Sequence, residues 1–235
     1  MIAGLQKMTL LDYPGKVACT VFLQGCNFRC PFCHNSGLLA GTPEPNIPRE
    51  ELISFLRKRQ GILDGVCITG GEPTLWKELP DLIRQIREMG FAVKLDTNGY
   101  RPEVLKQLVY DGLLDYVAMD IKNCPARYGE TVGVPNLDIS KIEESMEFLM
   151  TGSLDYEFRT TVVAEFHRAE DVAAIGQWFR TIAPENPVKK YFLQVYTHRD
   201  SVLCPGLHPP KNEDLQAFLA EITPYVHQTE IRGSV

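Results

Sequence analysis

The chain has 235 residues, of which 44% are hydrophobic and 23% are charged, and its formal net charge is −6. This composition is typical of a folded globular protein, and we predict one domain over residues 1–235. An acidic chain without an extended basic run lacks the charge that neutralises phosphates, so we expect no nucleic-acid partner. No apolar stretch approaches the roughly 18 residues of a membrane-spanning helix.

The beginning of the chain bears on location. Residues 1–16 lack a basic segment followed by an apolar core, which is the pattern of a secretory signal. We therefore expect a cytoplasmic protein without a membrane partner. In a reducing compartment, the seven cysteines suit ligand, redox or core roles better than disulfides.

Strand-like and helix-like patterns alternate along the chain. Short β-branched and apolar runs predict six strands, at residues 16–24, 65–70, 91–99, 114–122, 155–163 and 189–196. Apolar residues at helical spacing predict a helix after each strand, at residues 49–59, 78–90, 102–112, 138–150, 170–180 and 212–222. Six such βα units predict an α/β fold with parallel strands. They are fewer than the eight of a closed barrel, so an open partial barrel and a doubly wound sheet both fit.

Four unusual segments lie at the ends of the first four predicted strands: GCNFRC after the first, TGGEPT after the second, DTNG after the third and MDIK at the end of the fourth. In parallel α/β folds, active sites collect at the carboxyl ends of the strands. The sequence therefore predicts one pocket that gathers all four segments.

The segment GCNFRCPFCHN holds Cys26, Cys30 and Cys33 in a C-x3-C-x2-C spacing. A structural zinc site needs a fourth ligand, and His34 is at hand, but the adjacent Cys33 and His34 fit one tetrahedral ion poorly. A cysteine-rich loop without metal is a second interpretation. The third is a [4Fe–4S] cluster held by three thiolates, which leaves one iron open to bind and polarise a small molecule.

These residues resemble a known family. The cysteine triplet with the aromatic Phe32 before its last cysteine, followed by TGGEPT after the next strand, resembles the radical S-adenosylmethionine (SAM) superfamily. Over TLLDYPGKVACTVFLQGCNFRCPFCHN the chain is similar to activating enzymes of glycyl-radical proteins, above all those of anaerobic ribonucleoside-triphosphate reductase. DTNG and MDIK also resemble the pyruvate formate-lyase activating enzymes. The resemblance implies a partial, open (β/α)6 TIM-like barrel.

The resemblance also implies the chemistry. The thiolates of Cys26, Cys30 and Cys33 would hold the [4Fe–4S] cluster, whose open iron chelates the amino nitrogen and carboxylate of SAM. An electron, supplied by a flavodoxin or ferredoxin, then breaks the sulfur–C5′ bond and gives a 5′-deoxyadenosyl radical. That radical would remove a hydrogen atom from a glycine of a partner glycyl-radical enzyme.

Three other functions stay open. The chain could activate a glycyl-radical enzyme of the pyruvate formate-lyase type, or act on a small molecule by radical SAM chemistry. It could also be a non-catalytic zinc-binding module.

By the same resemblance, SAM contacts would come from the cysteine segment and from later strand ends. The predicted contacts are Phe32, Cys33, His34, Gly70, Gly71, Glu72, Pro73, Asn98, Lys122 and Arg159. Glu72 would accept a hydrogen bond from the SAM amino group, and Lys122 would meet the carboxylate or ribose. A monovalent cation would be held by Asp96, Thr97, the carbonyl of Ala118 and Asp120.

Plainer alternatives accompany these assignments. Phe32 also suits a core position, and TGGEPT and Asn98 suit tight turns. The carboxylates of Asp96 and Asp120 need partners, which Lys122 could supply. Arg159 points either to solvent or into the pocket. Where the pyruvate formate-lyase type has a histidine, this chain offers Tyr196 or His198.

Overall fold

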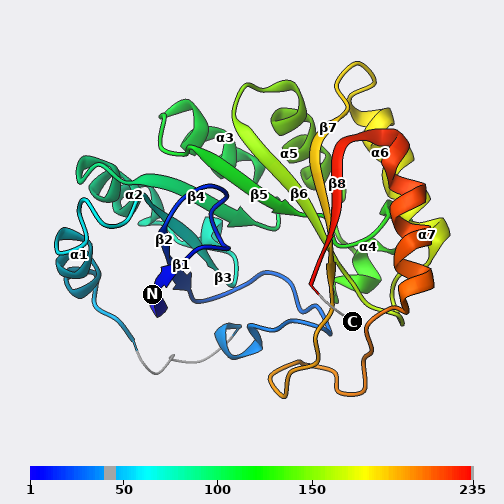
Figure 1. Cartoon of the computed structure of the whole chain (residues 1–235), viewed down its shortest axis with the longest axis horizontal. Helices are drawn as coiled ribbons and strands as arrows, with labels where there is room; N and C mark the ends of the chain where they lie inside the picture. Colours follow the sequence, from blue (N-terminus) through cyan, green and yellow to red (C-terminus); the bar gives the residue numbers. More distant parts are fainter. Residues whose placement is uncertain (40–45, 234–235) are drawn as a thin grey trace. The chain divides into compact units, whose positions relative to one another are not determined.

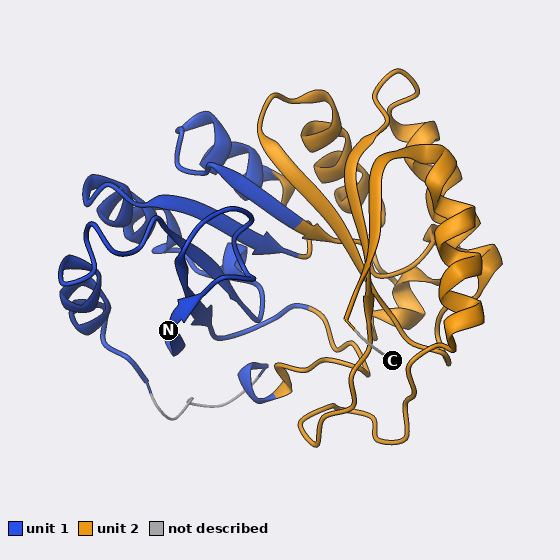
Figure 2. Cartoon of the chain, in the orientation of Figure 1, with its two compact units in different colours: residues 1–27, 37–97, 103–118 blue, residues 28–36, 98–102, 119–235 orange. Residues whose placement is uncertain are grey.

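The computed structural model describes residues 1–39 and 46–233. The chain divides into two compact units that interleave along the sequence (Figure 2). Unit 1 comprises residues 1–27, 37–97 and 103–118, and unit 2 comprises residues 28–36, 98–102 and 119–235. The prediction of a single domain over residues 1–235 is not tested by this division and stays a prediction.

Eight strands follow one another in the sheet in chain order (Figure 1). They are β1 (Ile2–Thr9), β2 (Ala18–Leu23), β3 (Gly65–Gly70), β4 (Ala92–Thr97), β5 (Tyr116–Asp120), β6 (Asp155–Val162), β7 (Val188–Val195) and β8 (Val226–Arg232). β1 is antiparallel to β2, whereas β2–β3, β3–β4, β6–β7 and β7–β8 are parallel pairs. All six predicted strands are present as β2 to β7, so the predicted α/β class is confirmed.

β1 and β8 were not predicted, and their position in the sheet explains why. They stand at the two ends of the strand order among the described residues. An edge strand pairs on one side and buries few side chains, so its sequence shows little apolar patterning. β8 accordingly has no fully buried residue, and the middle of β1 is exposed.

The described residues form seven α-helices and three short 3₁₀-helices. The α-helices are α1 (Arg49–Arg57), α2 (Leu79–Glu88), α3 (Pro102–Tyr110), α4 (Pro125–Thr131), α5 (Ser140–Thr151), α6 (Ala169–Ile182) and α7 (Asn212–Ile222). The 3₁₀-helices are η1 (Ser36–Leu38), η2 (Pro73–Leu75) and η3 (Thr223–Tyr225). The six predicted helices match all of these α-helices except α4, a short helix that begins with a proline.

Unit 1 brings the ends of β2 and β3 to the same edge. Leu23 pairs with Gly70 in the parallel register, so the segments that follow both strands leave the sheet together. Helices α1 and α2 bury the apolar faces that their spacing predicts, including Leu52, Leu56 and Ile83. Each such side chain contributes about 1.5–3 kcal/mol on burial, and this packing supports the strand ends.

Unit 2 is built around aromatic side chains. The rings of Tyr156, Phe158, Phe179 and Tyr191 form a chain with centroids 5.0–5.5 Å apart, which joins β6, α6 and β7. Helices α6 and α7 pack against each other and lie beside the strands β6 to β8 in Figure 1. Aromatic pairs of this geometry add about 0.5–1.5 kcal/mol each beyond their burial.

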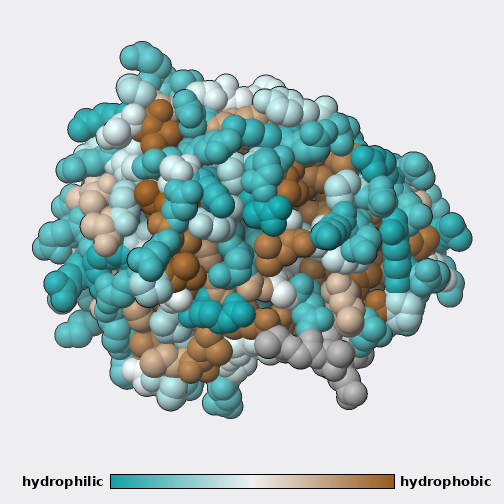
Figure 3. Space-filling view, turned by 180° about the vertical axis from the view of Figure 1, so that it is seen from behind, coloured by the Kyte–Doolittle hydropathy of each residue, from teal (hydrophilic) through white to brown (hydrophobic). Residues whose placement is uncertain are grey.

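Hydrophilic side chains cover most of the face seen in Figure 3, with hydrophobic ones in separate groups. Large exposed apolar residues include Met8, Leu10 and Leu11, which are 62%, 70% and 90% exposed. Over residues 1–39 and 46–233, no helix is both long and apolar enough to cross a membrane.

Candidate functional site

The cysteine segment is divided between the two units. Cys26 belongs to unit 1, whereas Cys30 and Cys33 belong to unit 2. The Cys33 amide donates a 3.1 Å hydrogen bond to the Cys30 carbonyl, so these two residues share one tight turn. All seven cysteines lie in the described ranges, and none of them forms a disulfide there.

Among the described residues, no group of three or more His, Cys, Asp or Glu side chains is arranged around a single metal ion. This geometry gives no support to the zinc interpretation of Cys26, Cys30, Cys33 and His34. A [4Fe–4S] cluster is larger than one ion and is ligated at separate irons, so its thiolates stand further apart. The assignment of the three cysteines as cluster ligands stays a prediction.

Cys30 is buried, and burial raises the pKa of its thiol to about 11. The positive charge of Lys122 opposes this effect and lowers the pKa, while Cys33 and Asp120 raise it further. A thiol bound to metal is deprotonated outright. The Lys122 ammonium is therefore placed to stabilise a Cys30 thiolate in unit 2.

Phe32 is buried and packs on two aromatic rings. Its centroid lies 5.7 Å from that of Phe166 and 6.3 Å from that of His167. His167 in turn donates from Nε2 to the Lys122 carbonyl at 2.8 Å and accepts at Nδ1 from the Val163 amide at 3.1 Å. The ring thus connects Phe32 to the backbone that carries Lys122.

The sequence interpretation missed His167, because a lone histidine shows no spacing motif. Its position just after the fifth predicted strand was the one available signal. Burial lowers the pKa of His167, which keeps the imidazole neutral and suits its one-donor, one-acceptor bonding.

His34 stacks on Tyr196 with ring centroids 5.5 Å apart. The His34 Nε2 and Tyr196 hydroxyl are buried, and neither has a hydrogen-bond partner among the described residues. Buried polar groups normally have partners, so both atoms have hydrogen-bonding capacity to spare. His198, by contrast, has a 56% exposed side chain. Of the two residues that the sequence offered at this position, Tyr196 is the one with a buried, unmatched group.

Asp120 at the end of β5 is held by two cations. Lys122 donates to Oδ2 at 2.9 Å, and Arg159 of β6 donates to Oδ1 at 3.0 Å. Burial alone would raise the pKa of Asp120, but the two positive charges outweigh it and hold the pKa at about 2. The pKa of Lys122 is correspondingly raised by Asp120. Arg159 therefore points to this cluster rather than to solvent, with a side chain 12% exposed.

Asn98 and Gly99 form a turn within unit 2. The Asn98 side chain accepts a 3.0 Å hydrogen bond from the Tyr100 amide, and Gly99 has φ +74°. A Cβ on Gly99 would lie 2.1 Å from the Met119 side chain. Turn geometry thus accounts for both residue types, and a SAM contact of Asn98 stays a prediction.

In unit 1, backbone segments after β2 and β3 lie in direct contact. The Gly71 amide donates to the Leu23 carbonyl at 2.8 Å, and the Glu72 amide donates to the Gly25 carbonyl at 2.7 Å. A Cβ on Gly71 would stand 2.0 Å from the Gly25 oxygen. Glycine is therefore required here for the close approach of two loops, one of which leads into Cys26.

Glu72 is 1% exposed and caps η2. Its Oε1 accepts hydrogen bonds from the Thr74 amide at 3.0 Å, the Thr74 hydroxyl at 2.5 Å and the Thr97 hydroxyl at 2.7 Å. These three donors fix the rotamer of a buried carboxylate. Pro73 opens η2 and sets the direction of the chain after Glu72.

Asp96 at the end of β4 forms an ion pair with Lys94, two residues earlier on the same strand. Thr97 donates to Glu72, and in unit 2 Asp120 is paired with Lys122 and Arg159. Three of the four predicted ligands of a monovalent cation thus have partners from the chain itself. The predicted cation site at Asp96, Thr97, Ala118 and Asp120 stays a prediction.

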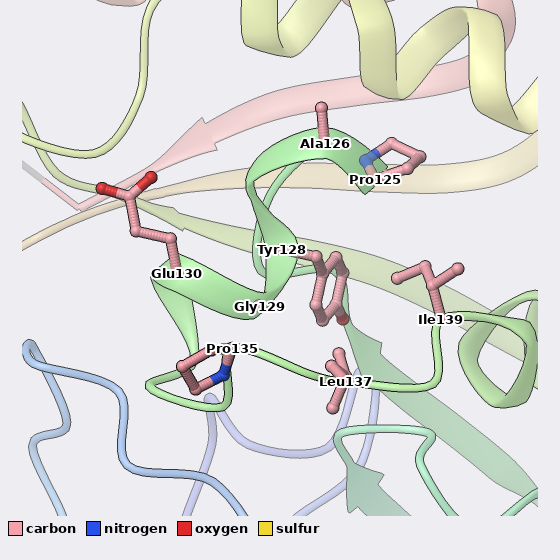
Figure 4. A pocket seen from close by; sticks show the side chains of 8 residues that line it. All are labelled: Pro125, Ala126, Tyr128, Gly129, Glu130, Pro135, Leu137 and Ile139. Carbon is pink, nitrogen blue, oxygen red and sulfur yellow. The ribbon is translucent and has the colours of Figure 1, made fainter.

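A hollow of about 520 Å³ lies beside α4 in unit 2 (Figure 4). Its lining is Pro125, Ala126, Tyr128, Gly129, Glu130, Pro135, Leu137 and Ile139. In Figure 4 the Tyr128 ring faces Leu137 and Ile139, whereas Glu130 points away from them. The Tyr128 hydroxyl donates to the Asp120 carbonyl at 3.3 Å, so this hollow borders the end of β5.

The comparisons with known proteins agree with these features. The model of the radical SAM superfamily matches residues 20–151, which is more than half of the chain. The chain therefore belongs to the radical SAM superfamily. It is a radical SAM enzyme, of a family whose members use a [4Fe–4S] cluster and SAM.

Two curated relatives and one solved structure refine the comparison. The chain is 35% identical over 184 residues to "Putative glycyl-radical enzyme activating enzyme MJ1227" of Methanocaldococcus jannaschii, covering 75% of this chain and 74% of that one. It is 35% identical over 133 residues to the pyruvate formate-lyase-activating enzyme of Clostridium pasteurianum, covering 52% of each. The crystal structure of QueE from Escherichia coli covers 99% of this chain and 93% of that one, with a TM-score of 0.60 and 18% identity, which shows a shared fold.

The residues present fit the family's cofactors. The thiols of Cys26, Cys30 and Cys33 stand within eight residues, and the glycine contact in unit 1 leaves no room for a side chain beside the loop to Cys26. In unit 2, the buried His34 Nε2 and Tyr196 hydroxyl have no hydrogen-bond partner among the described residues. Cys26, Cys30 and Cys33 would hold the cluster, and the predicted SAM contacts divide between the two units.

Proposed function

We propose that this protein is an activase that removes a hydrogen atom from a glycine of a partner glycyl-radical enzyme, with anaerobic ribonucleoside-triphosphate reductase as the partner. The observation that carries the proposal is the 35% identity to a glycyl-radical enzyme activating enzyme over three quarters of both chains. A flavodoxin or ferredoxin is the proposed electron donor.

The charges of the strand ends support SAM as the co-substrate. In unit 1, the formal charges of Glu72, Asp96 and Lys94 sum to −1. In unit 2, those of Asp120, Lys122 and Arg159 sum to +1. The methionine part of SAM carries an ammonium, which a negative group of side chains can bind, and a carboxylate, which a positive group can bind.

The nucleoside part of SAM needs apolar surface and hydrogen bonds. Phe32 supplies a ring whose position is fixed by Phe166 and His167. His34 and Tyr196 supply the unmatched Nε2 and hydroxyl. The cluster and SAM, when bound, supply the one-electron chemistry that abstracts hydrogen. The side chains bind, orient and exclude water.

An exposed apolar segment in unit 1 supports a protein substrate over a small molecule. Met8, Leu10 and Leu11 lie within four residues, and Leu11 is 90% exposed. Several neighbouring exposed apolar side chains are typical of a protein–protein contact. We assign this segment to contact with the partner enzyme.

The test mixes reduced, iron-loaded protein with SAM and the partner reductase without oxygen. We expect a glycyl-radical doublet by electron paramagnetic resonance, and deuterium from the labelled partner glycine in 5′-deoxyadenosine. A partner whose glycine is replaced by alanine is the control. Label that came from a small metabolite instead would reject the activase in favour of small-molecule chemistry, and a radical on pyruvate formate-lyase alone would reassign the partner.

A separate variant tests whether the apolar segment of Met8, Leu10 and Leu11 contacts the partner enzyme. Leu11→Ser should lower the rate of glycyl-radical formation at limiting partner concentration and leave SAM binding unchanged. Leu203→Ser is the matched control, since Leu203 is a 47% exposed leucine of unit 2. An equal effect of both changes would remove the assignment of the segment to the partner.

A further inference from the structure

Lys94 is a lysine in the buried part of a strand, and it is not among the predicted ligands of the cluster, of SAM or of the cation. It lies in the middle of β4, and its side chain is 2% exposed. An isolated ammonium in such a place is costly, so a buried lysine needs a fixed partner. A partner of opposite charge would account for a cation at this buried position.

That partner is Asp96. Side chains two residues apart on a strand point to the same face, so Lys94 and Asp96 lie side by side on β4. Lys94 Nζ donates to Asp96 Oδ1 in an ion pair whose two side chains are 2% and 15% exposed. Lys94 Nζ also lies 3.9 Å from the sulfur of Cys67, the register-paired residue of β3.

Asp96 is one of the residues that the resemblance assigned to a monovalent cation. A potassium or sodium ion there would neutralise this partly buried carboxylate and hold it in place. An ammonium group has the same charge as these ions and resembles potassium in size. Because it is attached to the chain and buried, it reaches Asp96 without the entropic cost of capturing an ion from solution.

We propose that the Lys94 ammonium takes the place of a monovalent cation at Asp96, so that this protein orders the end of β4 without potassium or sodium. Lys94 is then a positioning residue. It fixes the Asp96 carboxylate, and with it the start of the turn that carries Thr97, which donates to Glu72. The Lys94 ammonium and a metal ion cannot both occupy the position beside the Asp96 carboxylate.

The test measures cation dependence. Iron-loaded protein is melted without oxygen in potassium chloride, sodium chloride and tetramethylammonium chloride at equal ionic strength, and SAM affinity is measured in the same three salts. The wild-type protein should give the same Tm and the same SAM Kd in all three. A wild-type protein that needed potassium or sodium for either quantity would overturn the proposal without any variant.

Lys94→Met keeps the length of the side chain and removes its charge. In tetramethylammonium it should lower Tm by roughly 5 °C or more, because the partly buried Asp96 carboxylate loses the ammonium that is paired with it. Potassium should then restore a measurable part of the loss and tighten SAM binding again. The double change Lys94→Met with Asp96→Asn should abolish the response to potassium.

Lys58→Ala is the matched control, because Lys58 is an exposed lysine of the same unit. It should melt like the wild type in every salt. If Lys94→Met folds and neither its Tm nor its SAM Kd responds to potassium, Lys94 contributes only to packing. Should Lys94→Met fail to fold, Lys94→Gln and the wild-type salt comparison carry the test. No partner protein is present, so failure here leaves the activase proposal untouched.

Discussion

Each of the two compact units holds a partly buried carboxylate at the end of a strand, but the formal charges grouped there differ. In unit 1, Asp96 pairs with Lys94, and the next residue, Thr97, donates to the acidic Glu72. In unit 2, Asp120 pairs with Lys122 and Arg159. The formal charges of Glu72, Asp96 and Lys94 sum to −1, whereas those of Asp120, Lys122 and Arg159 sum to +1.

The difference follows from the positions of the cations on their strands. Lys94 comes two residues before Asp96 and is enclosed within the strand, so its charge stays with that carboxylate. Lys122 comes two residues after Asp120, beyond the end of β5, and its side chain is 16% exposed. A cation placed beyond a strand end can serve a ligand as well as its own aspartate. The same two-residue spacing thus gives an ion pair with a structural role in unit 1 and an ion pair that can also bind a ligand in unit 2.

The largest expected effect comes from changes to the predicted cluster cysteines, which are divided between the two units. Cys26→Ala in unit 1 and Cys30→Ala in unit 2 should each abolish the assembly of about four irons per chain and the paramagnetic signal after reduction. Iron analysis and electron paramagnetic resonance measure this. Cys204→Ala, which changes an exposed cysteine, should keep both. A Cys30→Ala protein with four irons and activity would contradict the ligand assignment.

The negative sum of unit 1 is tested at Glu72. Glu72→Gln retains an oxygen that accepts from Thr74 and Thr97, so the cap of η2 survives while the charge is lost. A hydrogen bond to a charged group contributes about 1.5–3 kcal/mol, so SAM Kd should rise roughly tenfold or more. Isothermal titration without oxygen measures it.

Two results define that test further. Glu78→Gln, an exposed glutamate of unit 1, should leave the Kd unchanged. Unchanged SAM binding in Glu72→Gln, together with intact iron content, would mean that the carboxylate only caps the helix.

A substitution at Gly71 tests the close backbone contact in unit 1. Gly71→Ala would place a Cβ 2.0 Å from the Gly25 oxygen, and backbone atoms must move to admit it. We expect a loss of about 1–3 kcal/mol in the free energy of unfolding, which denaturant titration measures. Gly37→Ala has open space around its Cβ and should stay within about 0.5 kcal/mol of the wild type. Equal stabilities of the two variants would show that the loops can separate freely.

Much of the fold was predictable because the central strands are buried. β2, β3 and β4 consist largely of residues with little or no exposure, and their apolar runs are visible in the sequence. The edge strands β1 and β8 lack that pattern, and their pairing depends on neighbours that sequence periodicity does not reveal. The motifs at strand ends were recognisable because several unusual residue types occur together.

Single residues of the site were harder to predict, because tertiary contacts give them their roles. Lys94 interrupts an apolar strand, and its spacing from Asp96 places both on one face, but the sequence does not show how deeply the pair is buried. His167 acquires its role only from Phe32 and the Lys122 carbonyl, which are distant in sequence. Tyr196 and His198 both follow the end of β7, and the structure distinguishes them by burial.

The smallest expected effect concerns His167, which ties the backbone of Lys122 in unit 2. Burial lowers the pKa of His167 in the folded protein below the unfolded value of about 6.5. The folded state therefore favours the neutral ring, and its stability is complete above about pH 6.5. As pH falls below that value the unfolded chain binds the proton first, so the free energy of unfolding declines by at most about 1.4 kcal/mol per pH unit. The decline ends once the pH passes the folded-state pKa.

His167→Gln removes this titration while keeping a side-chain donor for the Lys122 carbonyl. Its Tm should therefore fall less than that of the wild type between about pH 7.5 and pH 5.5, measured by circular dichroism. Burial also lowers the pKa of His34, so both proteins keep that part of the slope. His227→Gln, an exposed histidine of β8, should follow the wild-type curve. If His167→Gln kept the full wild-type slope, the neutral ring would not be what secures Lys122 in unit 2.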